Sequence, residues 1–156
     1  MTAKNAGSDI IATNPSARHH FHILETVEAG IVLTGTEVKS IRAGGANLRD
    51  AFARIEHDLP ILYQCHIAPY DKGNIHNHEP LRPRLLLLHK KQILRLAQQV
   101  KQRGKTLVAL DMHWRNGHVK ILLGLAQGKT KGDKRQSLKN EQTKRELSRL
   151  LKNLRR

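Results

Sequence analysis

The clearest pattern in the sequence is an alternation of apolar and polar residues on both sides of one short turn. Every second residue is apolar over residues 108–114 and again over residues 119–125. This period of two is typical of a strand with one buried face. Asn116-Gly117, between the two runs, is the kind of dipeptide that best tolerates the positive φ angles of a tight turn. The pattern predicts a β-hairpin over residues 106–126.

Other alternating runs predict strands in the first half of the chain. Residues 61–67 alternate in the same way, and the pattern places Tyr63 on the apolar face. Weaker patterns predict strands over residues 19–25, 30–34 and 49–57. Together with the hairpin, these runs predict about six strands.

Two helices are expected between the strands. Thr36 suits an N-cap and Gly44-Gly45 a helix end, so a short helix is predicted over residues 37–43. A longer helix is predicted to begin at Pro83 and to be capped by Gly104. Its apolar stripe consists of Leu86, Leu87, Ile93, Leu96, Ala97 and Val100.

These elements predict a mainly β fold. Short antiparallel strands with one helix that seals the core are typical of an OB-like barrel. We therefore expect a closed or partly open antiparallel barrel of about six strands with two or three helices over residues 14–127. Residues 1–13 are expected to form a flexible lead-in, and residues 128–156 a basic C-terminal tail.

Positive charge is concentrated in this tail. The chain has 28 Lys and Arg against 13 Asp and Glu, a net charge of +15. Residues 128–156 hold 11 of these basic and 3 of these acidic residues, and therefore more than half of the net charge. Leucines at helical spacing run through the segment: Leu147, Leu150, Leu151 and Leu154. Because an isolated helix of under about 20 residues is marginal in water, we expect the tail to be disordered when free and helical on its partner.

The composition excludes several classes of protein. No stretch approaches the roughly 18 apolar residues of a membrane-spanning helix, and no signal peptide is visible. Cys65 is the only cysteine, so no internal disulfide is possible, and a reducing cytoplasm is favoured. A large positive charge on a small chain favours a polyanionic partner, most commonly nucleic acid.

Two apparent chemical motifs do not hold. Residues 124–130 resemble a phosphate-binding loop, but three residues separate the two glycines where that loop needs four. His19, His20 and His22 suggest a metal site on the predicted strand, yet no acidic cluster completes one. Surface or RNA-facing histidines are the favoured interpretation. We expect no catalytic residue, no metal and no cofactor.

The aromatic residues indicate which kind of RNA recognition is favoured. Aromatic side chains make up only 3% of the chain, and Tyr63 and Trp114 fall on expected core faces. Single-strand binders rely on exposed aromatic platforms for base stacking, and this chain cannot build a large one. Phosphate contacts from Lys and Arg, with shape and hydroxyl recognition of a folded RNA, fit better.

Several longer segments form an ordered set along the chain. They are Asn14 with Ala17-Arg18-His19, residues 28–44, Ala46-Asn47-Leu48, residues 66–70, residues 80–89 and Asp133-Lys134-Arg135. Together these segments resemble the SmpB family, the SsrA-binding proteins that partner transfer-messenger RNA. The resemblance extends from about Asn14 to the C-terminus.

The resemblance implies a function in trans-translation. An OB-like barrel would bind the tRNA-like domain of transfer-messenger RNA and stand in for the missing lower half of a tRNA. With elongation factor Tu as an indirect partner, the complex would enter the A site of a ribosome stalled without downstream message. The tail would occupy the empty message channel and fold there as a helix. The resemblance further implies a cytoplasmic monomer that catalyses nothing and has no membrane partner.

The resemblance also implies two sets of site residues, taken from matching positions. The RNA-binding residues of the barrel would be Asn14, Arg18, His19, Glu28, Leu87 and Lys120. The ribosome-directed residues of the tail would be Gly128, Lys129, Asp133, Lys134 and Arg135.

Some roles within these sets stay open. Lys120 points away from the apolar face of its strand, as an RNA contact should, but an ordinary solvated lysine would do the same. Glu28 can accept hydrogen bonds from a base or a ribose, or orient an arginine such as Arg18. Leu87 can stack against a base or pack the long helix on the barrel, and the residues alone favour packing.

Three positions depart from the usual pattern of the family. Gln127 and Leu85 stand where basic residues are common, and Gly132 stands where an aromatic residue or histidine often precedes the Asp-Lys-Arg segment. A stacking contact to ribosomal RNA at the start of the tail would then be missing.

Three other classes of function compete with this interpretation. A general structured-RNA-binding or ribosome-associated protein would share the charge and the barrel but lack selectivity. A histidine-dependent nuclease would depend on His19, His20 and His22. A basic amphipathic tail could instead lie on anionic membranes.

Overall fold

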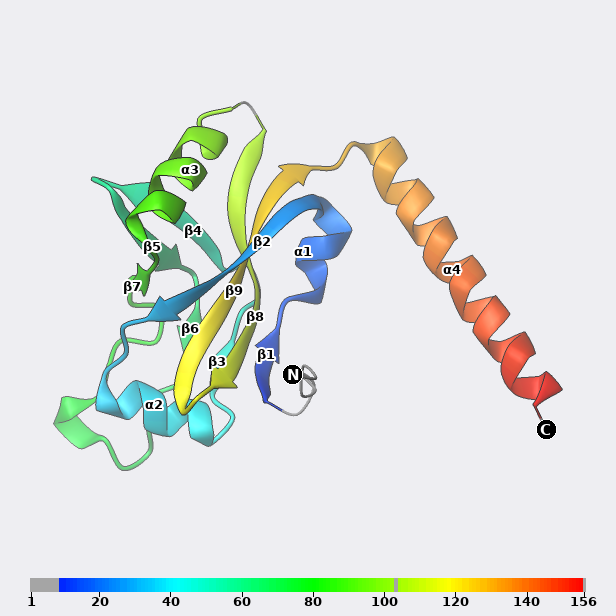
Figure 1. Ribbon diagram of the computed structural model, residues 1–156. Coiled ribbons are helices and arrows are strands. Elements are labelled where there is room, and N and C mark those ends of the chain that lie inside the picture. Colours follow the sequence, from blue (N-terminus) through cyan, green and yellow to red (C-terminus); the bar gives the residue numbers. More distant parts are fainter. Residues whose placement is uncertain (1–8, 103, 156) are drawn as a thin grey trace.

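The computed structural model describes residues 9–102 and 104–155. Its centre is a ring of six antiparallel strands in the order β8-β4-β5-β7-β2-β9, which closes because β9 also pairs with β8. The ring strands are β2 (Phe21–Ile31), β4 (Phe52–Glu56), β5 (Leu59–Tyr63), β7 (Arg84–Leu87), β8 (Lys105–Arg115) and β9 (His118–Gly128). The predicted OB-like barrel is therefore confirmed (Figure 1).

The predicted hairpin is the longest pairing in the ring. β8 and β9 pair from Lys105 opposite Gln127 to Arg115 opposite His118. Asn116 and Gly117 connect the strands with φ angles of 51° and 77°, the left-handed backbone that the turn requires. The sequence pattern succeeded here because the alternation and the turn residues agree.

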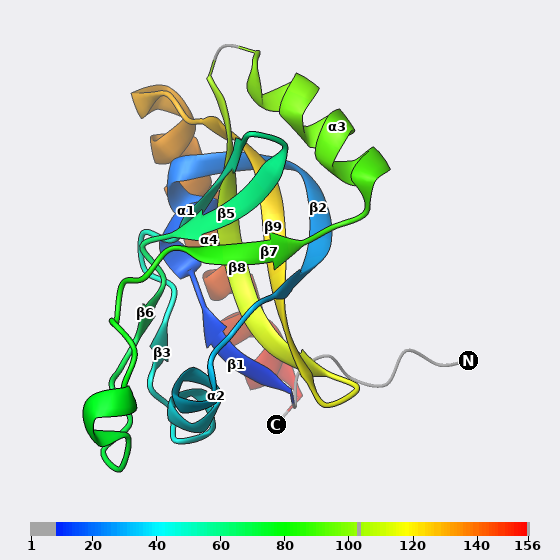
Figure 2. The same ribbon diagram turned by 90° about the vertical axis from the view of Figure 1, so that its left-hand side faces the viewer.

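Smaller elements surround the ring. β1 (Ile10–Thr13) pairs with β8 along the same edge as β4, and β3 (Ala46–Asn47) pairs with β6 (His66–Ile67) in a separate two-stranded sheet. Residues 10–13 of the expected flexible lead-in therefore form a strand that extends the sheet. Residues 1–8 of that lead-in lie outside the described residues. Figures 1 and 2 show α3 (Lys90–Val100) at one end of the ring and α2 (Gly35–Arg42) at the other.

The core is apolar and closely filled. Leu62, Leu107, Met112 and Ile121 from the ring strands are almost completely buried, and Leu96 of α3 joins the same cluster. The helix therefore seals one end of the barrel, as the sequence predicted.

A buried ion pair ties α2 to the ring. The side chains of Glu37 and Arg84 have no exposed surface, and Arg84 Nε donates to Glu37 Oε1 at 2.9 Å. Arg82 donates to the same carboxylate at 2.9 Å, and the Thr34 backbone N–H completes its shell. Burial disfavours the charged carboxylate, but these donors outweigh it and lower the pKa of Glu37. Thr34, rather than Thr36, is the N-cap, so α2 begins two residues before the predicted helix.

The long predicted helix was wrong in its first turns. Residues 84–87 form β7, and the helix begins only at Lys90, with His89 as its N-cap. A short apolar run fits a buried strand as well as a helix. Pairing with β5 and β2 makes this segment a strand. Arg84 and Leu86 then face the core, while Leu87 faces outward. The helix ends at Val100, and Gly104, with a φ angle of 81°, belongs to the turn that follows.

The predicted strand over residues 61–67 is interrupted. Gln64 has a φ angle of 59°, which ends β5 and switches the buried face. Leu62 is therefore buried, whereas Tyr63 lies on the outside, stacked on Phe52 at 5.5 Å between ring centroids, and donates to Glu56 at 2.8 Å. The assignment of Tyr63 to the core was wrong.

The other predicted strands shift at their ends. Residues 19 and 20 belong to α1 (Pro15–His20), so the strand predicted over 19–25 begins at Phe21. It continues without a break to Ile31, so only the first two residues of the predicted 30–34 strand are part of a strand. Pro15 at the first helical turn favours this helix. The strand predicted over 49–57 is shortened to β4.

The tail forms α4 (Lys131–Leu154), which projects away from the barrel (Figure 1). Thr130 and Asp133 form a capping box at its start, and none of its residues is buried. The tail is therefore helical in this structure, and its folding on a partner stays a prediction. Disorder of the free tail in solution also stays a prediction, and the lack of any buried residue in α4 favours it.

Candidate nucleic-acid interface

Three of the six predicted RNA-binding residues line one groove on the wall of the barrel. The groove, about 390 Å³ in volume, lies beside β2, β7 and β9 at the start of α3. Gly30 of β2 is in register with Leu87 of β7 on one side and with Lys120 of β9 on the other. Glu28 lies two residues before Gly30 on the same face of β2. Three neighbouring strands therefore place Glu28, Leu87 and Lys120 side by side.

Leu87 occupies this groove as an exposed apolar side chain. It is 55% exposed, so it does not pack the long helix on the barrel, the role that the residues alone favoured. A Cβ atom at Gly30 would lie 3.1 Å from the Leu87 Cβ, so the glycine leaves room for Leu87 above the strand. An exposed leucine in a groove beside a lysine can cover the face of a base or a ribose.

Glu28 is held by two basic side chains from β8. His113 Nε2 lies 3.0 Å from its carboxylate, and Arg115 Nη1 donates to both carboxylate oxygens at 3.0 and 3.1 Å. Partial burial disfavours the charge, but these hydrogen bonds outweigh it and lower the pKa of Glu28. Arg115, and not Arg18, is therefore the arginine that Glu28 orients.

His113 forms the centre of this network. Its Nδ1 lies 2.6 Å from Asp111, so the ring bridges two carboxylates. Burial favours the neutral ring, but the hydrogen bonds to Asp111 and Glu28 outweigh it and raise the pKa of His113. Its backbone is in register with Lys120, which continues the row of Leu87, Gly30 and Lys120 onto a fourth strand.

Sequence reasoning missed His113 and Arg115. A signal was present, because Asp111, His113 and Arg115 occupy alternate positions on the outward face of the predicted hairpin. Which acidic residue they would meet depended on the pairing of β2 with β9 and of β9 with β8, and no local pattern reveals that register.

The other three predicted RNA-binding residues lie on or beside α1. Asn14 is only 6% exposed, donates to the Ala109 carbonyl at 2.9 Å and accepts from Ser16 at 2.9 Å, so its side chain anchors the start of the helix. Arg18 is exposed, and His19 is half-buried with its ring centroid 4.9 Å from that of His20. The structure thus divides the predicted barrel residues into a groove set and an α1 set.

The start of the tail is joined to α1. Lys129 Nζ donates to the Arg18 carbonyl at 2.9 Å and to Ser137 at 2.8 Å, and its backbone N–H donates to the His20 carbonyl at 3.0 Å. Gly128 is the last residue of β9. These contacts bring the first residues of the tail to the α1 set.

The remaining tail residues lie in the first turns of α4. Hydrogen bonds from Thr130 lower the pKa of Asp133, which also lies 3.4 Å from His22 Nε2. Lys134 is half-buried and Arg135 is exposed. The five predicted tail residues therefore follow one another along a short path from the barrel into the helix.

The described part of the chain shows no arrangement suited to catalysis by a metal. Among residues 9–102 and 104–155, no three His, Cys, Asp or Glu side chains come together as metal ligands. Burial raises the pKa of the Cys65 thiol to about 11, which keeps it protonated. The segment that resembles a phosphate-binding loop is part of strand β9 up to Gly128. None of the described helices is long and apolar enough to cross a membrane.

Comparison with known proteins agrees with this geometry. The family model of the SmpB protein matches residues 11–153. The SsrA-binding protein of Enterococcus faecalis (strain ATCC 700802 / V583) is 54% identical over 147 residues, 94% of this chain and 96% of the relative. That of Shouchella clausii (strain KSM-K16) is 54% identical over 143 residues, 92% of each chain.

A solved structure shows the same architecture. A chain described as "tmRNA-SmpB: a journey to the center of the bacterial ribosome" is 47% identical, with a TM-score of 0.65, over 81% of this chain and 92% of its own length. The predicted resemblance is confirmed by these matches. The chain belongs to the SmpB protein family.

Proposed function

We propose that the protein binds the tRNA-like domain of transfer-messenger RNA and delivers it to the A site of stalled ribosomes during trans-translation. Its relatives are SsrA-binding proteins, and the solved structure that it resembles is described as tmRNA-SmpB. The single observation that carries the proposal for this chain is the row of Leu87, Gly30 and Lys120 with Glu28 beside it.

The groove offers three different kinds of contact to RNA. The Lys120 ammonium neutralises a phosphate. The Glu28 carboxylate, kept charged by His113 and Arg115, accepts hydrogen bonds from a base amino group or a ribose hydroxyl. Leu87 supplies apolar surface between these polar groups. Such a mixture suits a folded RNA that presents backbone and base edges at fixed positions.

The tail suits a partner of another shape. α4 carries most of the basic residues of the segment from 128 to 156, and its helix is exposed along its length. A narrow passage lined by ribosomal RNA would neutralise these charges and cover the leucine stripe. The contacts of Lys129 with α1 would fix the direction in which the helix leaves the barrel. The empty message channel has the required charge and shape.

The protein contributes binding rather than chemistry to this function. Peptide tagging uses the RNA and the ribosome, so the proposed function requires no catalytic side chain, metal or cofactor of the protein. Delivery with elongation factor Tu to the ribosome would take place in the cytoplasm, and we expect the protein to act there as a monomer.

Competitive binding to labelled transfer-messenger RNA tests the proposal. In about 150 mM salt, the full chain should bind this RNA in the presence of excess bulk tRNA. Leu87→Ala and Lys120→Gln should each weaken binding about 5- to 150-fold, the effect of losing about 1–3 kcal/mol of contact. Lys72→Gln, which removes an exposed lysine from a distant turn, is the matched control. Equal affinity for unrelated structured RNAs would instead support a general RNA-binding protein.

A further inference from the structure

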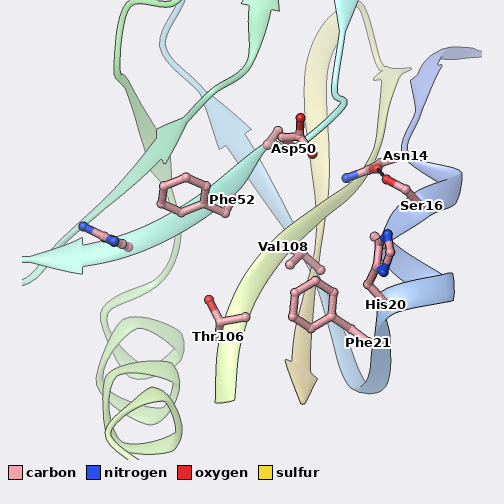
Figure 3. Close-up of a pocket in the computed structure, with 11 residues that line it drawn as sticks. Asn14, Ser16, His20, Phe21, Asp50, Phe52, Thr106 and Val108 are labelled. Carbon is pink, nitrogen blue, oxygen red and sulfur yellow. Dashed lines mark hydrogen bonds between the residues drawn. The ribbon is translucent and has the colours of Figure 1, made fainter. Parts of the chain in front are cut away.

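A second hollow lies on the wall of the barrel, between α1, β4 and β8. It has a volume of about 350 Å³, within the range of about 300–1,000 Å³ typical of ligand pockets. Its lining is mainly apolar and includes Phe21, Phe52, Val108 and Thr106. Figure 3 shows the two phenylalanine rings and Val108 around one space, with His20 of α1 at its side.

This pocket is separate from the groove of Leu87 and Lys120. In the closed order of the ring, the β8–β4 boundary is three strands away from the β7–β2 boundary in either direction. The pocket therefore lies on the opposite wall of the barrel. A ligand in the pocket and an RNA in the groove do not compete for space.

The pocket gathers aromatic side chains that are scarce in this chain. The sequence has five aromatic residues, of which Phe21 and Phe52 line the pocket. Tyr63 supports Phe52 from the neighbouring strand, with the rings stacked at 5.5 Å and an interplanar angle of 21°. Both phenylalanines are half-buried and keep accessible surface. The chain has too few aromatic side chains to stack the bases of a long single-stranded nucleic acid, but those at the pocket are enough to stack one base.

The polar groups around the pocket match the parts of a nucleotide. The guanidinium of Arg54, an exposed residue, lies 5.2 Å from the Phe52 ring centroid and can reach a phosphate or cover a stacked base. At the other end, Asp50 and Asn14 both line the pocket (Figure 3). The exposed carboxylate of Asp50 can accept from a base amino group or a ribose hydroxyl.

We infer that this pocket binds one unstacked nucleobase of an RNA, with the base against Phe52 and Phe21 and the adjoining phosphate at Arg54. The inference rests on the proposed function, which brings the protein to RNA. The net charge of +15 favours a polyanionic RNA as the ligand over an uncharged apolar molecule or a basic peptide. Transfer-messenger RNA and ribosomal RNA are the two sources of such a base.

Two binding assays on the full chain test the inference and separate the sources. One uses purified transfer-messenger RNA, and the other uses purified ribosomes with an empty A site. Phe52→Leu keeps the apolar bulk but removes the stacking surface, and should weaken binding in one assay about 5- to 150-fold, since stacking contributes about 1–3 kcal/mol per base. Phe52→Tyr should restore binding, and Arg54→Gln should weaken it in the same assay. Lys72→Gln is the control for charge.

The outcomes decide both the inference and its source. Loss with transfer-messenger RNA alone, or with ribosomes alone, supports the pocket and identifies the RNA that fills it. Equal binding by Phe52→Leu, Phe52→Tyr and the unchanged chain in both assays overturns it. Unselective binding by the unchanged chain would contradict the proposed function, whereas the comparison of Phe52→Leu with Phe52→Tyr would still decide the pocket.

A fluorescence measurement keeps the test valid if Phe52→Leu does not fold. Phe52→Trp retains an aromatic ring and places an indole in the pocket. Stacking with a base should quench its emission on addition of the RNA, beyond any change of Trp114 in the unchanged chain. Emission that changes no more than that of Trp114 with either RNA source would overturn the inference.

Discussion

Gly30 of β2 and Leu87 of β7 lie opposite each other on neighbouring strands, so close that a Cβ on Gly30 would lie 3.1 Å from the Leu87 Cβ. This distance is tighter than ordinary van der Waals contact, so one of the two side chains would have to move. Leu87 is 55% exposed and can move outward without disturbing the core. The position of Leu87 in the groove therefore depends on the glycine.

Gly30→Ala should consequently separate binding from stability. We expect the free energy of unfolding to change by less than about 1 kcal/mol, because alanine suits a strand at least as well as glycine. Affinity for transfer-messenger RNA should fall several-fold because Leu87 is displaced. Denaturant unfolding and RNA titration of the same preparation measure both. Unchanged affinity would show that the position of Leu87 does not matter for binding.

The buried pair of Arg84 and Glu37 should dominate the stability of α2. Arg84→Met leaves the Glu37 carboxylate buried with Arg82 as its remaining charged partner, and should cost about 3–5 kcal/mol in the free energy of unfolding. Arg84→Met combined with Glu37→Leu should recover part of this loss, because no unpaired charge is left. Arg49→Gln, an exposed change, should stay within about 0.5 kcal/mol. A loss below about 1 kcal/mol for Arg84→Met would contradict this account.

Stability should depend on pH through His113. Its pKa is raised from the ordinary value of 6.5, so the folded chain holds this proton more tightly than the unfolded chain. The stabilisation is therefore complete below about pH 6.5 and is lost as the pH rises through the raised pKa of His113. Asp111, Glu28 and Arg115 are the charged groups that contact this network. Glu28 acts in the opposite direction: its lowered pKa gives stabilisation above about pH 4.5 that is lost on further acidification.

Unfolding measurements from about pH 5.5 to 9 test the role of His113. His113→Gln should lower the stability on the acidic side by on the order of 1 kcal/mol and flatten the decline towards alkaline pH. His118→Gln, at an exposed position on the partner strand, should leave the decline unchanged. The same slope in both variants would exclude His113 as its source.

The free tail should exchange its amide protons rapidly. α4 buries no residue, and its leucine stripe has no partner in the described structure. Most of the stability of a protein helix comes from packing of its apolar face, which α4 lacks, so residues 131–154 should be far less protected than the β8–β9 hairpin of the same full chain. Protection should increase when the protein binds stalled ribosomes. Free-chain protection equal to that of the hairpin would refute tail disorder.

Gly132 gives a test of the start of the tail. It is the second residue of α4, and a Cβ there would meet only Thr130 Oγ1, at 3.8 Å, so a larger side chain fits. Gly132→Tyr should raise the rate of peptide tagging by adding a stacking surface, while affinity for transfer-messenger RNA stays unchanged. Gly132→Ala is the control, since it adds only helix propensity. Equal tagging by Gly132→Tyr and Gly132→Ala would show that stacking is not the missing contribution.

The accuracy of sequence reasoning depended on whether local signals decide the structure. The hairpin was predicted because Asn116-Gly117 and the alternation on both sides agree. The residues of β7 were assigned to a helix because an apolar run of four fits either element, and only pairing with β2 and β5 decides. Tyr63 was placed in the core because nothing local announces the positive φ angle of Gln64.

The site was predictable only in part for the same reason. Family positions identified Glu28, Leu87 and Lys120, and the structure brings them together. The partners of Glu28 come from β8, and the two phenylalanines of the second pocket come from β2 and β4. These neighbours depend on strand register and ring closure, which are tertiary properties.

Recognition of transfer-messenger RNA by the barrel is tested most directly by comparing the full chain with a chain that ends at Thr130. This end keeps β9 intact and retains Lys129 while it removes α4. Both proteins are titrated into labelled transfer-messenger RNA in about 150 mM salt with bulk tRNA as competitor. We expect tight and selective binding by both, because recognition lies in the groove of the barrel and the tail serves the ribosome. Selective binding that disappears with the tail, or unselective binding by both proteins, would contradict it.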